Sequence, residues 1–442
     1  MYISVDDTDS RTGNCTSYLM TEIVRELSLT YDIIGNPRLV RLNPACPWKT
    51  RGNGALALRV GKGTGRKKTI GKIGGKEIAA FPSASADEPD ESELIKKIVP
   101  IIEKNRSEGS DPGLVVSRKR PPRSLYENGV SKIIEKEYVK KELERIGAKT
   151  FELGNGRGII GAACAMAWEP GDSTYEVLAY RERKRWGTER SYDPLSVMEM
   201  DIAFPGTFNS WEERAQKVTM IPSTPCPVLF GLRGDDEEET IRAAMHLRTE
   251  TMERWISFLT NQGTDDHIIR NASEIEENSS YEISGTVRSY AKRMHGGHSF
   301  IDLETRYGTI TCAAYEPSKE FRMLFDNLIP GDEIVVIGEM RDEPRTFNTE
   351  KVKVTKLAEK FVKTSNPVCQ SCGKRMQSAG RGQGYRCKEC RTRSKTPTIE
   401  KETRWVATGW YEPPASARRH LSKPLKRMNE EQRVEFVNSR IA

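Results

Sequence analysis

Apolar and polar residues alternate in blocks along the first third of the chain, and the blocks have the lengths of short strands and amphipathic helices. Residues 3–5 form a short, mostly apolar run of the kind found in buried strands. A helix is predicted soon after, because apolar residues recur three or four positions apart: Leu19, Met20, Ile23, Val24 and Leu27. Helical spacing returns over residues 89–105 and 132–146, with a buried strand between them at 113–117. Strands interleaved with helices predict an α/β domain over residues 1–150.

The pattern over residues 151–275 predicts a second mixed domain. Residues 173–181 alternate as a strand, residues 228–232 form a short apolar strand, and a helix is predicted from there through Leu259. An antiparallel sheet covered by helices indicates a ferredoxin-like domain. In the first domain, the Gly- and Lys-rich residues 61–76 predict a mobile hairpin or insertion rather than a part of the core.

Residues 276–362 contain short strands with turn residues between them, which predicts an OB-fold β-barrel. Barrels of this type bind single-stranded nucleic acid through basic and aromatic side chains. The predicted fold class is therefore a multidomain α+β protein.

Charge is distributed unevenly. The chain carries a net charge of +7, but residues 363–442 alone carry +11, which leaves −4 on residues 1–362. A basic module on a slightly acidic body predicts a polyanionic partner held at one end. No apolar run approaches the ~20 residues that cross a bilayer, and five of the nine cysteines are scattered. We therefore expect no membrane partner, no disulfide framework, a cytoplasmic location and a monomer.

Three carboxylates follow the first strand at once: Asp6, Asp7 and Asp9. Mg²⁺ is commonly held by one or two carboxylates together with substrate phosphates, so these residues predict a magnesium site. The alternative is a solvated acidic turn in which aspartate caps the following helix.

A loop between two predicted strands, residues 38–42 and 55–60, combines cations and amides with permissive glycines. Such a loop suits phosphate contacts, although it lacks the Walker A spacing. Its candidate ligands for a nucleotide are Arg41, Asn43, Lys49, Thr50, Arg51 and Asn53.

Two Cys-x₂-Cys pairs stand fourteen residues apart: Cys369, Cys372, Cys387 and Cys390. This spacing predicts a closed structural Zn²⁺ site, hence a zinc ribbon over residues 363–395. The remaining residues, 396–442, mix aromatic with basic side chains and predict a tail that binds single-stranded ends of RNA; the alternative is a helix packed on the ribbon.

An Asp-rich strand end, a cationic loop, a barrel and a ribbon together indicate an ATP-using enzyme that acts on RNA. Over essentially its full length the chain resembles the archaeal agmatidine synthetases. The resemblance rests on DDTDS at 6–10, CTSYL at 15–19, RLVRLNPACPWKTRGNGA at 38–55, STYEVLAYR at 173–181 and the four cysteines.

The resemblance implies an N-terminal kinase-like domain and an ATP-dependent ligase. Enzymes of this family attach agmatine to C2 of the wobble cytidine in the isoleucine tRNA with a CAU anticodon. The base is activated by phosphorylation, and a threonine after the motif's cysteine becomes phosphorylated. That threonine is Thr16 by position, and Ser17 stands where the family often has a second threonine.

Agmatine carries a guanidinium group, which needs carboxylate or carbonyl partners. Asp172, near Tyr175, is the predicted agmatine site. The competing hypothesis is a non-catalytic RNA-binding protein, for which the barrel and ribbon suffice but which leaves the aspartates and the cationic loop unexplained.

Overall fold

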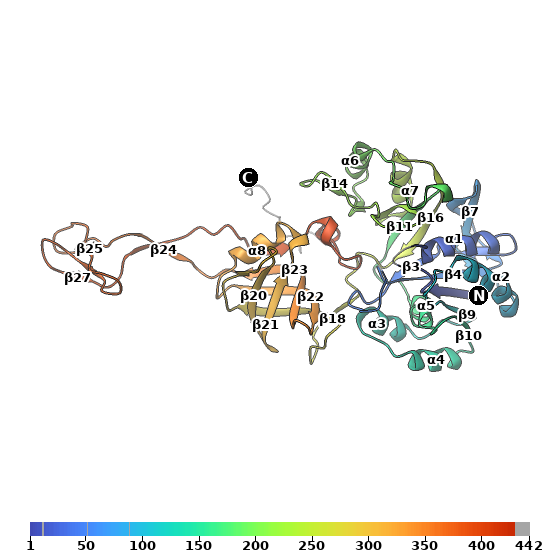
Figure 1. Cartoon of the computed structure of the whole chain (residues 1–442), viewed down its shortest axis with the longest axis horizontal. Helices are drawn as coiled ribbons and strands as arrows, with labels where there is room; N and C mark the ends of the chain where they lie inside the picture. Colours follow the sequence, from blue (N-terminus) through green and yellow to red (C-terminus); the bar gives the residue numbers. More distant parts are fainter. Residues whose placement is uncertain (11–12, 51, 88, 429–442) are drawn as a thin grey trace.

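The computed structural model describes residues 1–10, 13–50, 52–87 and 89–428. The molecule is elongated: a body that contains the N-terminus lies at one end, a β-barrel follows, and a small ribbon lies at the other end (Figure 1). Within the described residues, no helix has both the length and the apolar character needed to cross a membrane.

The N-terminal domain is built on a sheet whose strands are mostly antiparallel. In sheet order its first strands are β10 (Lys149–Glu152), β9 (Gly113–Ser117), β1 (Tyr2–Asp6), β4 (Gly54–Gly61) and β2 (Asp32–Ile34). β1 is central, with Ile3 opposite Val116 of β9 on one side and Leu58 of β4 on the other. Its alternate residues therefore face opposite sides of the sheet, and both sides are covered.

One face of this sheet packs on α1 (Thr16–Leu27) and α2 (Glu91–Asn105), around a core that includes Ile3, Val5 and Ile23. The other face packs on α3 (Arg123–Ser131), α4 (Lys136–Arg145) and the small-residue helix α5 (Gly158–Ala167). The predicted α/β layering is present. The helix expected over residues 132–146 corresponds to α4, while α3 was not predicted.

Residues 61–76 contribute to a hairpin, one of the two predicted alternatives, but this hairpin is part of the main sheet and not a separate insertion. They contribute β5 (Gly63–Thr64), which pairs with β8 (Ser83–Ala84), and β6 (Lys68–Ile73), which pairs with β7 (Lys76–Phe81) and with β16 (Met252–Thr260) of the next domain. Gly71 is required in β6, since a Cβ there would stand 2.6 Å from the carbonyl oxygen of Trp255. The glycine that suggested a loop is thus a site of close backbone approach.

The second domain has the strand order of a ferredoxin-like fold. β11 (Thr174–Arg181), α6 (Pro194–Ala203), β12 (Thr207–Phe208), β15 (Val228–Gly234), α7 (Glu237–His246) and β16 follow each other along the chain. In the sheet the order is β16-β11-β15-β12, all antiparallel. Small strands β13 (Trp211–Glu212) and β14 (Lys217–Val218) pair beside it.

The helix predicted through Leu259 is wrong, because α7 ends at His246 and residues 252–260 form β16. β16 lies in the interior of the sheet, between β11 and β6, and also pairs with β3 (Arg38–Arg41). A strand in the middle of a sheet covered on both faces buries side chains of both parities, so it lacks the alternation that identifies a half-buried strand.

The OB-fold is a closed barrel with a capping helix. Its strands are β18 (Ser279–Val287), β20 (Ser299–Thr305), β21 (Gly308–Ala314), β22 (Glu333–Arg341) and β23 (Thr346–Lys356), and β18 closes the barrel by pairing with both β20 and β22. The helix α8 (Phe321–Asn327) lies between β21 and β22 and contributes Leu324 and Phe325 to the barrel core. Short strands β17 (Ile268–Ile269) and β19 (Lys292–Arg293) extend the sheet.

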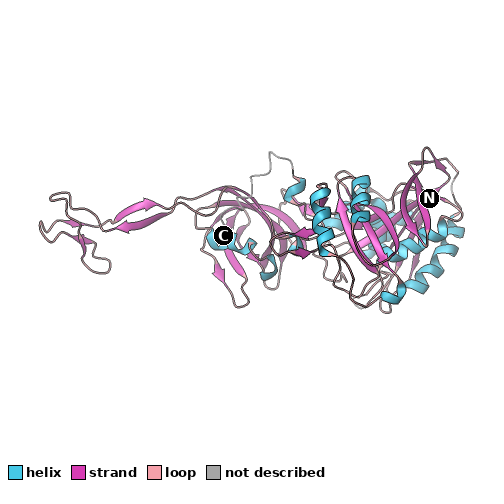
Figure 2. Cartoon of the chain, turned by 90° about the horizontal axis from the view of Figure 1, so that it is seen from above, coloured by secondary structure: helices cyan, strands magenta, loops and turns pink. Residues whose placement is uncertain are grey.

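The zinc ribbon stands apart on a two-stranded stalk of β24 (Phe361–Ser365) and β28 (Thr398–Lys401) (Figure 2). Its tip is a three-stranded sheet of β25 (Gln377–Ser378), β26 (Tyr385–Arg386) and β27 (Arg393–Ser394). The chain then returns to the barrel, where β29 (Gly409–Tyr411) pairs with β23. Residues 412–428, here called the strap, run from the barrel to the first two domains.

Candidate active site

A cavity of about 660 Å³ lies where the N-terminal domain, the ferredoxin-like domain and the strap meet. We call it the central cavity. It is lined by the end of β1 and the start of α1, by the loop after β3, by the start of α5 and by residues of β11 and β15. Strap residues 418–421 complete the lining.

The carboxylates of the N-terminal motif form one wall of this cavity. β1 ends at Asp6, and Asp7 turns the chain with a backbone φ of +56°, a conformation that aspartate and asparagine tolerate better than most residues. Asp6, Asp7 and Asp9 all line the cavity. The three acids predicted at the strand end thus share one cavity, although their carboxylate oxygens do not converge as closely as the ligand atoms of a formed metal site.

Burial and repulsion from neighbouring carboxylates make Asp6 and Asp7 reluctant to ionise. Burial, helped by the charges of Asp7 and Asp9, raises the pKa of Asp6 to about 8. Burial also raises the pKa of Asp7 to about 6, with the charges of Asp111 and Asp9 adding to it and Arg157 opposing. Carboxyls in this state gain from a cation bound between them, because the cation compensates the repulsion.

The helix α5 approaches this wall closely through its glycines. A Cβ on Gly161 would stand 1.8 Å from Oδ2 of Asp6, and one on Gly158 would stand 2.6 Å from the Asp6 carbonyl oxygen. Gly158 and Gly161 thus have a steric reason: only glycine at these positions lets the first turns of α5 lie against the end of β1. The Asp111 carboxylate accepts a hydrogen bond from the Asn155 amide at 2.8 Å and fixes this loop.

Two hydroxyls at the start of α1 face the same cavity but have different partners. Thr8 donates a hydrogen bond to the Thr16 hydroxyl at 3.1 Å. The Ser17 hydroxyl accepts a hydrogen bond from Tyr180 at 2.9 Å and lies 3.0 Å from the sulfur of Cys15. Both side chains are buried in the fold and line the cavity.

The loop after β3 faces the acidic wall as predicted, but its residues play different parts. Thr50 donates a hydrogen bond to Asp9 at 3.0 Å and so joins the loop to the acidic cluster. Lys49 donates to the Pro44 carbonyl, and its pKa is lowered by burial and by the nearby Arg419. Arg51 lies outside the described residues.

Asn43 and Asn53 hold the loop together. Asn43 is buried and donates to the carbonyl of Asn278, just before the barrel, while Asn53 donates to the carbonyl of Asn43, each at 2.8 Å. Their side-chain amides are thus engaged by the protein itself.

Cations form the wall opposite the aspartates. Arg233 pairs with Glu176 at 3.1 Å, and Arg41 approaches the same carboxylate at 4.0 Å. Gln262 also donates to Glu176, at 2.6 Å. Burial lowers the pKa of Arg41, an unfavourable state for a cation that an anionic ligand would relieve.

Asp172 and Tyr175, the predicted agmatine residues, do not lie among the residues that line the central cavity. Asp172 is ion-paired with Lys423 and Arg427 of the strap, each at 2.8 Å. Tyr175 lies on β11, where burial raises its pKa. Their assignment to agmatine stays a prediction, and the two ion pairs already balance the Asp172 charge.

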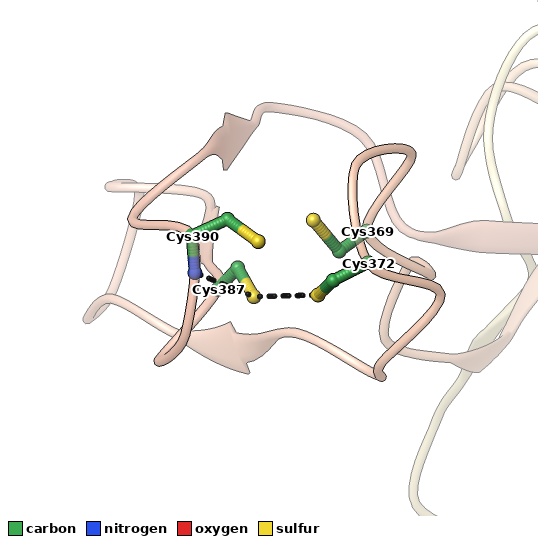
Figure 3. Close-up of side chains that lie close together, drawn as sticks. All are labelled: Cys369, Cys372, Cys387 and Cys390. Atoms are coloured by element: carbon green, nitrogen blue, oxygen red, sulfur yellow. Dashed lines mark hydrogen bonds between the residues drawn. The ribbon is translucent and has the colours of Figure 1, made fainter.

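The four cysteines of the ribbon converge on one point (Figure 3). Their sulfur atoms lie within 4.8 Å of one another, and those of Cys372 and Cys387 are 3.5 Å apart. Four thiolates in this arrangement fit the tetrahedral coordination of structural zinc. In the part of the chain that the structure describes, this is the only group of three or more His, Cys, Asp or Glu ligand atoms so close together.

Family models match the chain in four consecutive segments: the TiaS TCKD domain at residues 2–155, the TiaS FLD domain at 156–267, an OB-fold nucleic acid binding domain at 281–358 and the TiaS C-terminal zinc ribbon domain at 366–406. TiaS of Archaeoglobus fulgidus, an isoleucine-tRNA 2-agmatinylcytidine synthetase, is 38% identical over 456 aligned residues, which cover 99% of each chain. The TiaS of Methanocaldococcus jannaschii is 36% identical, covering 96% of this chain and 98% of its own.

The chain belongs to the TiaS family.

Solved TiaS structures agree with the fold over the whole length. The structure of TiaS in complex with its isoleucine tRNA and ATP superposes with a TM-score of 0.86 at 36% identity, covering 98% of this chain and 99% of that one. A complex of TiaS with the same tRNA, AMPCPP and agmatine gives a TM-score of 0.83 at 34% identity with the same coverage. The expected membership of the agmatidine synthetase family is thus confirmed.

Sequence reasoning missed several residues that line the central cavity or lie beside it. Asp111 and Arg157 come from loops that only the fold brings beside the aspartates. Glu176 lies inside the STYEVLAYR motif that carried the resemblance, and its place on the same strand face as Leu178 and Tyr180 could have indicated an inward carboxylate. The strap residues 418–420 were assigned to an RNA-binding tail, and no local signal indicates that they line a cavity formed by two distant domains.

Proposed function

We propose that this chain is an ATP-dependent ligase that attaches agmatine to C2 of the wobble cytidine of the isoleucine tRNA with a CAU anticodon, and that the central cavity is where it does so. The observation that carries the assignment to this cavity is the meeting of the acidic cluster and the loop of residues 41–54 in one space. Membership of the TiaS family supports the overall reaction.

The proposed reaction has two steps. The cytosine O2 attacks the γ-phosphorus of ATP and ADP leaves, so that O2 becomes part of a phosphate ester. The agmatine amine then attacks C2, the C2–O2 bond breaks, phosphate leaves with O2, and the amine loses a proton. Phosphoryl transfer depends on positioning and charge neutralisation, which a cavity with opposed acidic and basic walls supplies.

The acidic wall fits a hard cation, because its donors are carboxylate oxygens, and the pKa values of Asp6 and Asp7 are raised. Asp6, Asp7 and Asp9 would share Mg²⁺ with the nucleotide phosphates; bound there, the ion would neutralise phosphate charge. Arg41, Lys49 and Thr50 supply further phosphate contacts, together with Arg51. Asn43 and Asn53, already engaged by protein atoms, act by shaping the loop.

The N-terminal domain would also act as a kinase on the protein itself: the Thr16 hydroxyl would attack the γ-phosphorus of a separate ATP, ADP would leave, and the hydroxyl proton would be lost. Because the Thr16 oxygen accepts the hydrogen bond from Thr8, its own proton can be donated towards the cavity. Ser17 is the weaker candidate, because Tyr180 and Cys15 surround its oxygen. Mass spectrometry of the protein after incubation with ATP distinguishes the two sites.

The tRNA would lie along the elongated molecule, with the barrel and ribbon as contact modules. A wobble base must be turned out of the anticodon stack to enter an enclosed cavity. We expect a monomeric enzyme, since one chain contains both walls of the cavity. We also expect a cytoplasmic location.

The test is to incubate purified protein with the CAU-anticodon isoleucine tRNA, ATP and agmatine, and to analyse the wobble nucleoside by mass spectrometry. The expected product is agmatidine, formed only when all three substrates and Mg²⁺ are present. Binding of tRNA without ATP consumption or modified nucleoside would instead support the non-catalytic RNA-binding alternative.

A further inference from the structure

The strap joins all three large domains. Near its start, Arg419 pairs with Glu339 and with Glu350 of the barrel, the latter at 3.2 Å. Leu421 is buried in the core of the N-terminal domain that contains α5. At its end, Arg427 pairs with Asp172 at 2.8 Å and with Asp235 at 2.6 Å, both in the ferredoxin-like domain.

Between these anchors the backbone of the strap is held against the segment that follows β16. The Gly263 amide donates to the His420 carbonyl at 2.8 Å, and the Asp265 amide donates to the Leu421 carbonyl at 2.9 Å. The backbone at residue 420 is therefore fixed, and its side chain lies on the lining of the central cavity.

The His420 ring packs on Gly52, in the loop that carries Lys49 and Thr50. A Cβ on Gly52 would stand 3.1 Å from both Cδ2 and Nε2 of His420, and 2.5 Å from a guanidinium nitrogen of Arg41. Position 52 must therefore be glycine, because a side chain there would occupy the space in which the His420 imidazole and the Arg41 guanidinium contact the loop backbone.

The surroundings of the ring are cationic. The charge of Arg41, burial, and the charges of Arg233 and Lys49 hold the pKa of His420 well below its ordinary value. Near neutral pH the imidazole is uncharged, so it fills the space between three cations without adding to their repulsion.

We propose that His420 is a positioning residue of the reaction: carried into the cavity by the strap, its ring packs on Gly52 and fixes the loop of residues 49–54 opposite the acidic cluster. The consequence is a physical link from the barrel, through Arg419 and His420, to Thr50 and Asp9. This inference rests on the proposed function, because it assigns the loop to nucleotide phosphates.

The test compares His420→Ala, His420→Phe and the matched control Ser416→Ala, which changes an exposed side chain in the same strap. Agmatidine formation is measured with ATP, agmatine and tRNA varied in turn. For His420→Ala we expect kcat to fall ~100-fold, the scale of a misplacement by about 1 Å, with a raised KM for ATP and tRNA affinity within about twofold. His420→Phe keeps a flat uncharged ring and should recover most of kcat, and the control should match the wild type.

A double-mutant cycle tests the contact itself. Gly52→Ala alone should reduce kcat, because the added methyl group displaces the ring or Arg41. In the Gly52→Ala/His420→Ala variant the two losses should be clearly less than multiplicative, since the Arg41 guanidinium, which is the group nearest the added methyl, can shift into the space left by the ring.

Three results would overturn the inference: full activity of His420→Ala, loss of activity in His420→Phe equal to that in His420→Ala, which would indicate proton transfer by the imidazole, or independent effects in the cycle. If the wild-type protein makes no agmatidine, the proposed function fails instead. Should His420→Ala fail to fold, the Phe variant and Gly52→Ala still give kcat and KM for ATP.

Discussion

Replacing Lys351 by methionine should loosen the attachment of the strap to the barrel. Lys351 lies on β23 with only 1% of its side chain exposed, and its ammonium pairs with Asp265 at 2.5 Å, itself 8% exposed. The same ammonium donates to the Lys423 carbonyl at 2.9 Å. One buried lysine therefore ties together the barrel, the segment after β16 and the strap.

Removal of one member of a buried ion pair typically costs about 3–5 kcal/mol, because the partner charge remains buried. Asp265 keeps one other donor, the Lys423 amide at 2.7 Å, so the lower end of that range applies. We expect Lys351→Met to lower the free energy of unfolding by about 3 kcal/mol. The methionine side chain should replace most of the packing of the lysine stem.

The assay is denaturant unfolding followed by intrinsic fluorescence. The transition that reports separation of the domains is fitted separately from the other transitions. The matched control is Lys356→Met, which removes an exposed ion pair with Glu333 from the same strand and should leave that transition in place. Lys351→Met/Asp265→Asn should cost less than the sum of the two single changes, since neither partner is then left charged alone. A loss below ~1 kcal/mol in Lys351→Met, or strictly additive losses, would refute the reasoning.

Three further predictions concern the acidic wall and the zinc site. Asp7→Asn, which tolerates the positive φ, should abolish tRNA-stimulated ATP consumption while tRNA affinity stays within a few-fold; equal loss of both would indicate a folding defect. Cys369→Ser should lower bound zinc, measured by atomic absorption, and weaken tRNA binding; a fully metallated variant would refute the four-thiolate site. The raised pKa of Asp6 means that its proton is bound more tightly in the folded protein, so this residue stabilises the metal-free fold below pH ~4 and that contribution is lost as the pH rises through about 8. Asp6→Asn should therefore gain stability over the wild type between about pH 5 and 8 in the absence of divalent ions, and equal pH dependence of the two proteins would contradict this assignment.

Local sequence patterns were sufficient to predict those features that depend on a single strand, helix or ligand motif. The strand that ends in the aspartates, the following helix, the strand Gly113–Ser117 and the four-cysteine ribbon could all be predicted, because alternation, helical spacing and ligand spacing are local properties. The clustering of Asp6, Asp7 and Asp9 follows from their position at one strand end.

The sequence did not reveal which distant segments of the chain pair or contact one another. β16 looked helical because its apolar residues lie on both faces of the strand and pack into different cores: Ile256 and Phe258 on one side, Trp255 and Leu259 on the other. Gly71 looked like a loop residue, but it lies in β6, where the close approach of the Trp255 carbonyl oxygen leaves no room for a side chain. Arg419 and Lys423 looked like RNA ligands, yet each is ion-paired with a carboxylate of the folded body, Glu339 and Asp172, and Arg418 is ion-paired with Glu412 within the strap.

The path of the chain through the ribbon decides how truncations should be designed. The ribbon is an excursion that leaves and re-enters at neighbouring points, since Phe361 and Lys401 face each other at the base of the stalk. Deleting the ribbon and its stalk between these two points would leave β29 and the strap in the protein. A stop codon placed after the ribbon would instead remove strap residues 418–421 from the lining of the central cavity, so a loss of activity in that variant would not measure any contribution of the ribbon to RNA binding.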